Sequence, residues 1–184
     1  MSTIADRQIT AQELFEHPEW ESFELVRGRL VFRKLNSAQH GWIAGNVFAA
    51  LYNFVRAIDA GVVFMTNTGV ILERDPDTVR GPDGMFLSKH RIPSDGIPEG
   101  YLTSAPDLAF EIVSPEDRFS ELTEKVESYL AAGTRLVWVI DPNTERAHVF
   151  QQGRNVISLD HSQPLSGEDV LPGFLLKVAD IYRD

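Results

Sequence analysis

The chain has 184 residues, of which 43% are hydrophobic and 24% are charged, a balance typical of globular proteins and not of disordered or collagen-like chains. Its 27 acidic and 17 basic residues give a net charge of −10, which argues against a protein that coats nucleic acid through bulk electrostatics. Cysteine is absent, which excludes disulfides, thiolate nucleophiles and cysteine-based metal sites.

The length suits one domain, which we expect to span residues 1–184 with a lead-in over residues 1–20. The N-terminus lacks the basic and apolar segments of a signal peptide. No apolar run approaches the roughly 18 residues that a membrane span needs. We therefore expect a cytoplasmic protein with no membrane partner, in line with the absence of cysteine.

The first half of the chain predicts a hairpin, a long helix and several strands. Two β-type runs within residues 23–32 flank Arg27-Gly28, the pattern of a tight hairpin. A helix is predicted over residues 38–57, because its apolar residues recur at spacings of three and four behind a capping Ser37. Strands are expected at residues 62–66, 70–72 and 82–87.

The second half predicts one parallel crossover. An apolar strand over residues 107–113 precedes a helix over residues 115–133 and the buried-type strand LVWVI at 136–140. This unit requires a parallel strand pair, whereas the other strands are linked as hairpins. We therefore predict an α/β (α+β) fold, a mixed β-sheet flanked by helices. Edge strands are expected at residues 147–150 and 156–159, and the apolar tail at 171–182 is expected to close the core.

Residues 88–105 contain two prolines and two glycines and show little periodicity. This composition predicts a surface loop. Because a loop of this length without structure of its own is more often functional or mobile than neutral, the segment is a candidate for contact with a substrate.

Glu111 is the first candidate for chemistry, because a carboxylate inside an apolar strand costs several kcal/mol to bury unless it is paired, protonated or bound to a cation. Alternation along the strand places Asp107, Ala109, Glu111 and Val113 on one face. Glu111 is therefore either a functional group or part of a structural ion pair.

Asp83 and Asp107 both follow a proline at the start of a predicted strand. Asp107 and Glu111 are about 13 Å apart along one strand, too far to share a metal ion. Asp83 arrives from another strand and can approach Glu111. We therefore prefer Asp83 as the partner of Glu111 and assign Asp107 a capping or loop-pinning role.

Lys125 lies at the edge of the apolar stripe of the predicted helix, three residues after Leu122. Its ammonium can reach the end of the sheet, or it can remain in solvent and pair with a neighbouring glutamate. Glu24 is similarly either a surface residue of the hairpin or an acid that supports a site. The histidines show no metal-binding spacing, and dinucleotide, P-loop and nucleophile-elbow motifs are absent.

In combination, these features resemble the restriction-endonuclease-like PD-(D/E)XK nuclease fold and, within it, the Uma family of restriction endonucleases. The matching segments run in the same order over about residues 20–180. They are FELVRGRLV at 23–31, a helix opening with Gln39-His40, GPDGMF at 81–86, APDLAFEIVSP at 105–115, Lys125 with Tyr129 and Gly133, LVWVIDP at 136–142 and LPGF at 171–174.

The resemblance implies a core of order αβββαβ with an N-terminal hairpin and a small antiparallel C-terminal extension. It implies that Asp83 on the second core strand, Glu111 on the third and the main-chain carbonyl of Ile112 hold Mg²⁺ or Mn²⁺, ions that prefer such oxygen ligands. The superfamily usually places a lysine two positions after the glutamate, but Val113 stands there in this sequence. Lys125 matches the relocated lysine of the family.

The resemblance also implies that Glu24, the recurrent acid of the hairpin, assists at the metal, and that Gln39 and His40 contact substrate or cap their helix. We therefore expect a Mg²⁺-dependent endonuclease acting on DNA, with residues 88–105 over the substrate channel and, by fold analogy, a homodimer. The alternative is a catalytically weak or inactive nuclease-fold module that binds or scaffolds. Val113 and the net charge of −10 favour this alternative.

Overall fold

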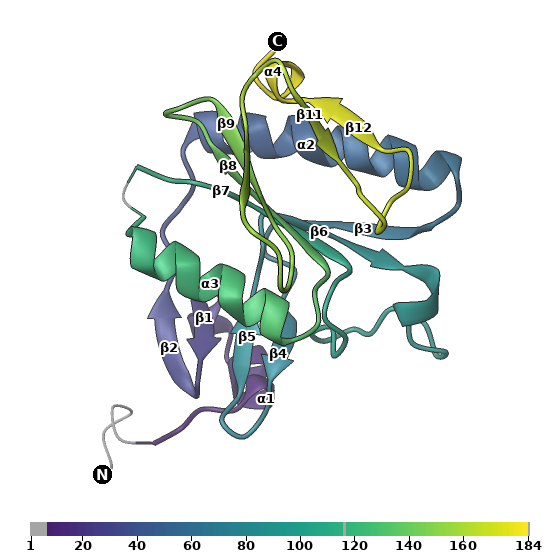
Figure 1. Cartoon of the computed structure of the whole chain (residues 1–184). Coiled ribbons are helices and arrows are strands. Elements are labelled where there is room, and N and C mark those ends of the chain that lie inside the picture. The colour runs from purple at the N-terminus through teal and green to yellow at the C-terminus, as the bar shows by residue number, and fades with distance from the viewer. Residues whose placement is uncertain (1–6, 116, 184) are drawn as a thin grey trace.

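The computed structural model describes residues 7–115 and 117–183, and its centre is a six-stranded mixed sheet with helices on both faces (Figure 1). The strand order is β10-β9-β8-β7-β6-β3. Only β7 and β8 pair in parallel among these strands, so the predicted crossover and the predicted mixed sheet are confirmed. The strands are β3 Gly61–Met65, β6 Gly84–Ser88, β7 Leu108–Ile112, β8 Leu136–Asp141, β9 Arg146–Phe150 and β10 Ile157–Leu159.

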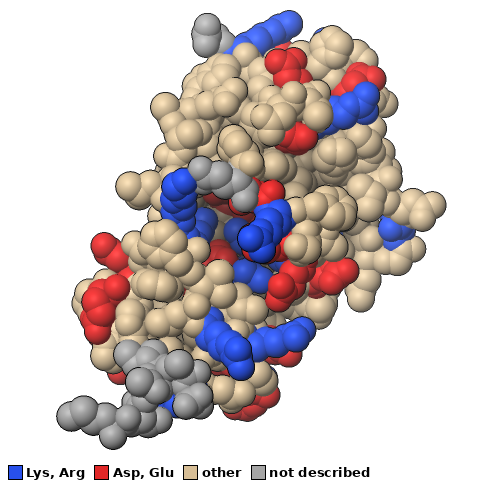
Figure 2. Space-filling view, turned by 90° about the vertical axis from the view of Figure 1, so that its left-hand side faces the viewer, with Lys and Arg blue, Asp and Glu red and all other residues tan. Residues whose placement is uncertain are grey.

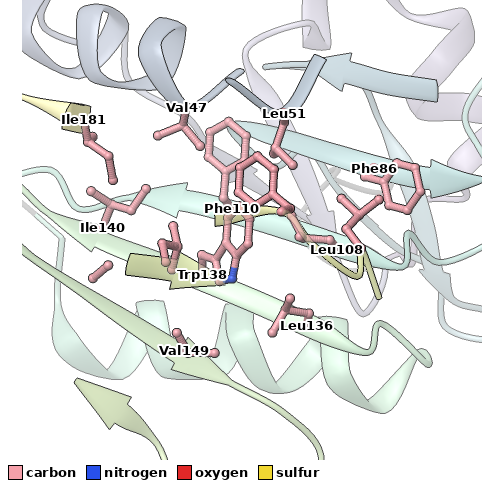
Figure 3. Close-up of a cluster of buried hydrophobic side chains, with 14 of the residues drawn as sticks. Val47, Leu51, Phe86, Leu108, Phe110, Leu136, Trp138, Ile140, Val149 and Ile181 are labelled. Atoms are coloured by element: carbon pink, nitrogen blue, oxygen red, sulfur yellow. The ribbon is translucent and has the colours of Figure 1, made fainter. Parts of the chain in front are cut away.

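The two faces of β7 pack against different helices, as its alternating pattern predicts. Leu108, Phe110 and Ile112 join the cluster that contains helix α2 (Ala38–Ala57) and the short C-terminal helix α4 (Val178–Ile181), part of which is drawn in Figure 3. Ala109 faces helix α3 (Phe119–Ala131) on the other side, among Val126 and other buried residues. The predicted bounds of α2 and its Ser37 cap are confirmed.

A second, four-stranded antiparallel sheet lies beside α3 and has the order β2-β1-β5-β4 (Figure 1). It begins with the predicted hairpin, in which Arg27 and Gly28 both adopt positive φ (48° and 75°). Helix α1 and the 3₁₀ helix that follows it precede the hairpin; of the predicted lead-in, residues 1–6 lie outside the described part. The bounds are α1 Ala11–Glu16, 3₁₀ Pro18–Trp20, β1 Phe23–Val26, β2 Arg29–Phe32, β4 Val70–Glu73 and β5 Thr78–Arg80.

The strands expected at 62–66 and 70–72 do not form a hairpin, because β3 belongs to the six-stranded sheet and β4 to the four-stranded one. The chain crosses between the sheets at this point. It returns through β5, a three-residue strand that the sequence did not predict, and then enters β6. The two sheets are therefore joined close to Asp83, the residue that precedes β6.

Helix α3 begins later than predicted, at Phe119 instead of residue 115, and Arg118 precedes it without a side-chain cap. The chain stays extended beyond β7, since the N–H of Val113 donates to the carbonyl of Ile140. Ser114 and Asp117 then close a turn through two hydrogen bonds. Ser114 is consequently part of this turn.

Residues 88–105 contain a 3₁₀ helix, Lys89–Arg91, and are otherwise irregular. Asp107 accepts a hydrogen bond from the N–H of Ser88 (2.8 Å), and its other carboxylate oxygen lies 3.2 Å from Nε of Arg91. Asp107 thus ties the two ends of this segment together, which is the pinning role that its sequence context suggested.

The C-terminal segment closes the core as predicted. Strands β11 (Pro164–Ser166) and β12 (Leu175–Lys177) form a small antiparallel sheet, and Phe174 stacks on Trp138 with 5.6 Å between ring centroids. Only β10 is an edge strand of the six-stranded sheet at this end, because β9 lies between β8 and β10. None of the described helices combines the length and apolarity that a membrane crossing requires.

The adjacent residues Phe174 and Leu175 test this closure, because Phe174 is 3% exposed and Leu175 is 66% exposed. Phe174→Ala should lower the free energy of unfolding by about 3–5 kcal/mol, the usual cost of deleting a buried phenylalanine. Leu175→Ala should change it by less than about 0.5 kcal/mol. Urea denaturation of both variants measures the difference. Equal effects would show that the tail does not close the core.

Candidate active site

A cavity of about 510 Å³ opens where the two sheets meet the first turns of α2 and α3. Figure 2 shows this face of the molecule, with basic and acidic side chains gathered in and around a hollow. Six of the candidate residues line the cavity, although their positions in the chain are far apart. They are Glu24, His40, Asp83, Glu111, Ile112 and Lys125.

Asp83 is fixed beside β7 by main-chain and side-chain hydrogen bonds. Its N–H donates to the carbonyl of Phe110 (3.1 Å), and its Oδ2 accepts from the N–H of Ile112 (2.8 Å). Nε2 of His40 lies 3.0 Å from the same oxygen. Burial alone would raise the pKa of Asp83, but the contact with His40, the charge of Lys125 and the Ile112 N–H together lower it.

Glu111 is buried on the α3 side of the sheet and is held through both carboxylate oxygens. Nζ of Lys125 donates to Oε2 (2.9 Å), and the hydroxyl of Tyr129 donates to Oε1 (2.7 Å). Burial raises the pKa of Glu111 to about 7; Lys125 opposes this shift, whereas the negative charges of Asp83 and Glu24 add to it. Glu111 is thus a carboxyl that changes charge near neutral pH.

Glu24 lies on β1, and its carboxylate is surrounded by positive charge. It accepts hydrogen bonds from Arg80 (3.0 Å) and from the N–H of Gly81 (2.9 Å), and Arg33 lies 3.7 Å away. Burial alone would raise its pKa, but Lys125, Arg33 and Arg80 lower the pKa to about 2. The four-stranded sheet therefore places a permanent negative charge opposite α3.

Lys125 bridges the two buried glutamates. Its Nζ lies 2.9 Å from Glu111 and 3.5 Å from Glu24, and its side chain is only 15% exposed. Burial would lower the pKa of Lys125, but these two carboxylates raise it above its ordinary value. Lys125 and Tyr129 are one turn apart on α3, so that both reach Glu111. Lys125 is therefore an inward-facing lysine, not a solvated one.

The charges of the cavity do not cancel. At its centre, the three carboxylates Glu24, Asp83 and Glu111 face Arg33, Arg80 and Lys125. The whole wall carries six carboxylate and four lysine or arginine side chains, an excess of negative charge. Within residues 7–115 and 117–183, no group of three or more His, Asp or Glu side chains is arranged to hold a metal ion. The ligand set implied by the resemblance consists of two carboxylates and one main-chain carbonyl, so it does not require three such side chains.

Gln39 and the 88–105 segment lie outside the cavity wall, which corrects the expected position of that segment. Gln39 is exposed and does not line the cavity, because it points away from the buried side of α2 on which His40 lies. Residues 88–105 do not contribute to its wall, since Asp107 and Arg91 hold them at the opposite end of β6 and β7. Residues 31–36 occupy the wall instead.

Arg33, Arg80 and Tyr129 were not assigned to the site from the sequence. Arg80 lies on the unpredicted strand β5, and Arg33 directly follows the hairpin, so neither has a local pattern that distinguishes it from a surface arginine. Tyr129 is part of the family match together with Lys125, but its sequence context indicated no role at the site. The available signal was its position four residues after Lys125, on the same face.

Comparison with a solved structure shows the same fold in another protein. The match has a TM-score of 0.83 with 21% sequence identity, and it covers 95% of this chain and 97% of the other. The other protein is described as "a putative nuclease belonging to DUF820 from Anabaena variabilis ATCC 29413". No curated protein matches the sequence.

Residues 11–179 match the Uma2 family, which is described as "Putative restriction endonuclease". The match covers nearly the whole sequence, and the chain belongs to this family. The resemblance inferred from the sequence motifs is thereby confirmed.

The raised pKa of Glu111 predicts a pH-dependent stability. The folded protein binds this proton more tightly than the unfolded chain, whose glutamates titrate near 4.5, so the contribution of Glu111 to stability falls as pH rises from about 4.5 to about 7. Glu111→Gln cannot lose a proton. The unfolding temperature of Glu111→Gln minus that of the wild type, measured without divalent cations, should therefore increase between about pH 5 and about pH 8.

The exposed Glu99 provides the control, because Glu99→Gln should keep a constant difference from the wild type over the same pH range. A constant difference for Glu111→Gln as well would show that Glu111 titrates like a surface carboxyl.

Proposed function

We propose that this protein is a metal-dependent nuclease that hydrolyses phosphodiester bonds of DNA. Membership of the Uma2 family supports a nuclease function in general. The observation that carries the specific proposal is the arrangement of Asp83, Glu111 and Lys125, which reach one cavity from three separate elements. From length and composition we further propose a single domain over residues 1–184 located in the cytoplasm, and by fold analogy a homodimer.

The donor atoms of the cavity suit Mg²⁺ or Mn²⁺, which prefer carboxylate and carbonyl oxygens. Asp83, Glu111 and the carbonyl of Ile112 would hold the ion. Each carboxylate oxygen of Glu111 accepts one hydrogen bond and retains a further lone pair, and the excess negative charge of the wall favours a cation. Bound there, the ion supplies a Lewis acid for the phosphate and lowers the pKa of an attacking water.

The remaining residues place and neutralise charge in this proposal. Position 113, where the superfamily usually has a lysine, is a valine that packs among the apolar residues under α3. Lys125 supplies the positive charge in its place. Its ammonium orients the attacking water and offsets charge that develops on the phosphate. Glu24 holds Lys125 and Arg80 in place. His40 orients the Asp83 carboxylate and leaves it ionised.

The alternative, a non-catalytic module for binding or scaffolding, is favoured by one observation. Glu24 and Glu111 already have cationic partners and Asp83 is in contact with His40, so the cluster is satisfied as a structural polar network. The two functions differ in whether the protein binds a divalent cation and cuts DNA.

Cleavage of plasmid, linear and branched DNA in Mg²⁺ or Mn²⁺ separates these functions. We expect cutting that EDTA abolishes and that Asp83→Ala and Glu111→Ala remove. Lys125→Met should reduce the rate by about 10²–10³-fold, the effect of removing one group that stabilises a developing charge. Asp95→Ala, an exposed carboxylate on the 88–105 segment, should leave the rate unchanged.

Cutting that persists in EDTA or in both alanine variants would overturn the two-carboxylate proposal. Absence of both cutting and heat of Mn²⁺ binding would favour the non-catalytic module.

Tyr129 is a positioning residue in this scheme, because its hydroxyl fixes Oε1 of Glu111 at 2.7 Å. Tyr129→Phe should weaken Mn²⁺ binding by about 10-fold, as loss of a hydrogen bond to a metal ligand does, with little change in KM for DNA. Calorimetric titration measures this affinity. Tyr182→Phe, which removes a hydroxyl that donates to the Asp141 carbonyl elsewhere, is the matched control. Equal Mn²⁺ affinities for the two variants would remove Tyr129 from the scheme.

A further inference from the structure

The cavity has two walls of opposite character. One wall is the continuous segment of residues 31–36, which runs from the end of β2 toward α2 and includes Arg33 and Lys34. The other wall belongs to α3 and the turn before it, and it carries the carboxylates of Asp117, Glu121 and Glu124. A polyanion that enters this groove is repelled from the α3 wall and is directed toward the 31–36 wall.

The 31–36 segment also exposes large apolar side chains along the edge of the four-stranded sheet, next to the polar cavity. Val31 is 42% exposed, Phe32 is 65% exposed and Leu35 is 96% exposed. Strand β2 is an edge strand, paired only with β1 among the described strands. Apolar side chains that gather at the rim of a site indicate a contact surface for a ligand or partner.

Phe32 is held in place while most of it remains exposed. Its ring packs edge-to-face with Phe23, with 5.6 Å between centroids and 71° between ring planes. An anchored, exposed aromatic ring beside basic residues is the arrangement on which unpaired nucleobases stack. In an intact duplex the bases stack on each other, and their flat faces are not available to such a ring.

We infer that the 31–36 wall binds a nucleic-acid strand whose bases are unpaired, with a base stacked on Phe32 and the backbone beside Arg33 and Lys34. This inference rests on the proposed nuclease function and narrows its substrate to single-stranded, flapped or looped DNA. The net charge of −10 agrees with it, because a strand bound by stacking needs fewer phosphate contacts than a duplex bound through its backbone.

The test is binding of fluorescently labelled DNA, followed by anisotropy in Ca²⁺ buffer for a single strand, a flap and a fully paired duplex. We expect the wild type to bind the single strand and the flap about 10-fold more tightly than the duplex. Phe32→Ala should lose this preference, and Phe32→Tyr, which keeps an aromatic ring, should retain it. Leu175→Ala is the control, since Leu175 is as exposed as Phe32 but lies on β12.

Equal or tighter binding of the duplex by the wild type would overturn the inference, as would equal effects of Phe32→Ala and Leu175→Ala. Light scattering of the same samples provides a further check. A change of oligomeric state in Phe32→Ala would indicate that the 31–36 wall is a contact between copies of the chain, which would also contradict strand binding.

The binding readout keeps this inference separate from the proposed function. Phe32-dependent binding of unpaired strands without any hydrolysis would reject the nuclease and retain the strand-binding wall. Hydrolysis of duplex DNA that is unaffected by Phe32→Ala would retain the nuclease and reject the strand-binding wall.

Discussion

Glu111 is a carboxyl buried in an apolar core, where its charge is tolerated only if it is paired. The ion pair with Lys125 provides this pairing. Glu111 lies opposite Val139 of the parallel neighbour β8 in the sheet and is 4% exposed. Lys125 and Tyr129 each donate to one of its oxygens from α3. Removing either donor leaves a buried oxygen without a partner, so the docking of α3 onto the sheet and the state of Glu111 depend on each other.

The second sheet extends this dependence beyond the core. Glu24 lies 3.5 Å from Lys125, and Arg80 and the N–H of Gly81 fix Glu24 in turn. The four-stranded sheet thus places the negative charge of Glu24 next to the Lys125 ammonium, which also contacts Glu111. The pKa of Glu24 is lowered to about 2 while burial raises the pKa of Glu111 to about 7, so of these two glutamates it is Glu111 that changes charge near neutral pH. The two glutamates are thereby distinguished by their surroundings.

Local patterns in the sequence predicted much of this architecture. The period of apolar residues located α2, the Arg27-Gly28 turn located the hairpin, and the β7–α3–β8 unit established the parallel pair. The assignment of strands to two sheets was not predictable, because a short strand such as β5 has no periodicity and pairing partners are distant in the chain.

The site was predictable where a residue type conflicts with its surroundings. Glu111 in an apolar strand and Asp83 after Pro82 stand out in the sequence, and both line the same cavity in the structure. Arg33 and Arg80 do not stand out, because arginine on a short strand or loop usually faces solvent. The 88–105 segment was placed at the wrong end of the sheet, since loop composition does not reveal which side of the fold a loop covers.

The central claim is that Asp83 and Glu111 hold one divalent cation beside Lys125. Anomalous X-ray diffraction from crystals grown with Mn²⁺ tests this claim most directly, because it locates the ion independently of activity. We predict a single anomalous peak at about 2.1–2.2 Å from the carboxylates of Asp83 and Glu111 and from the carbonyl of Ile112. A cavity that keeps its ion pairs and holds no peak at saturating Mn²⁺ would contradict the account.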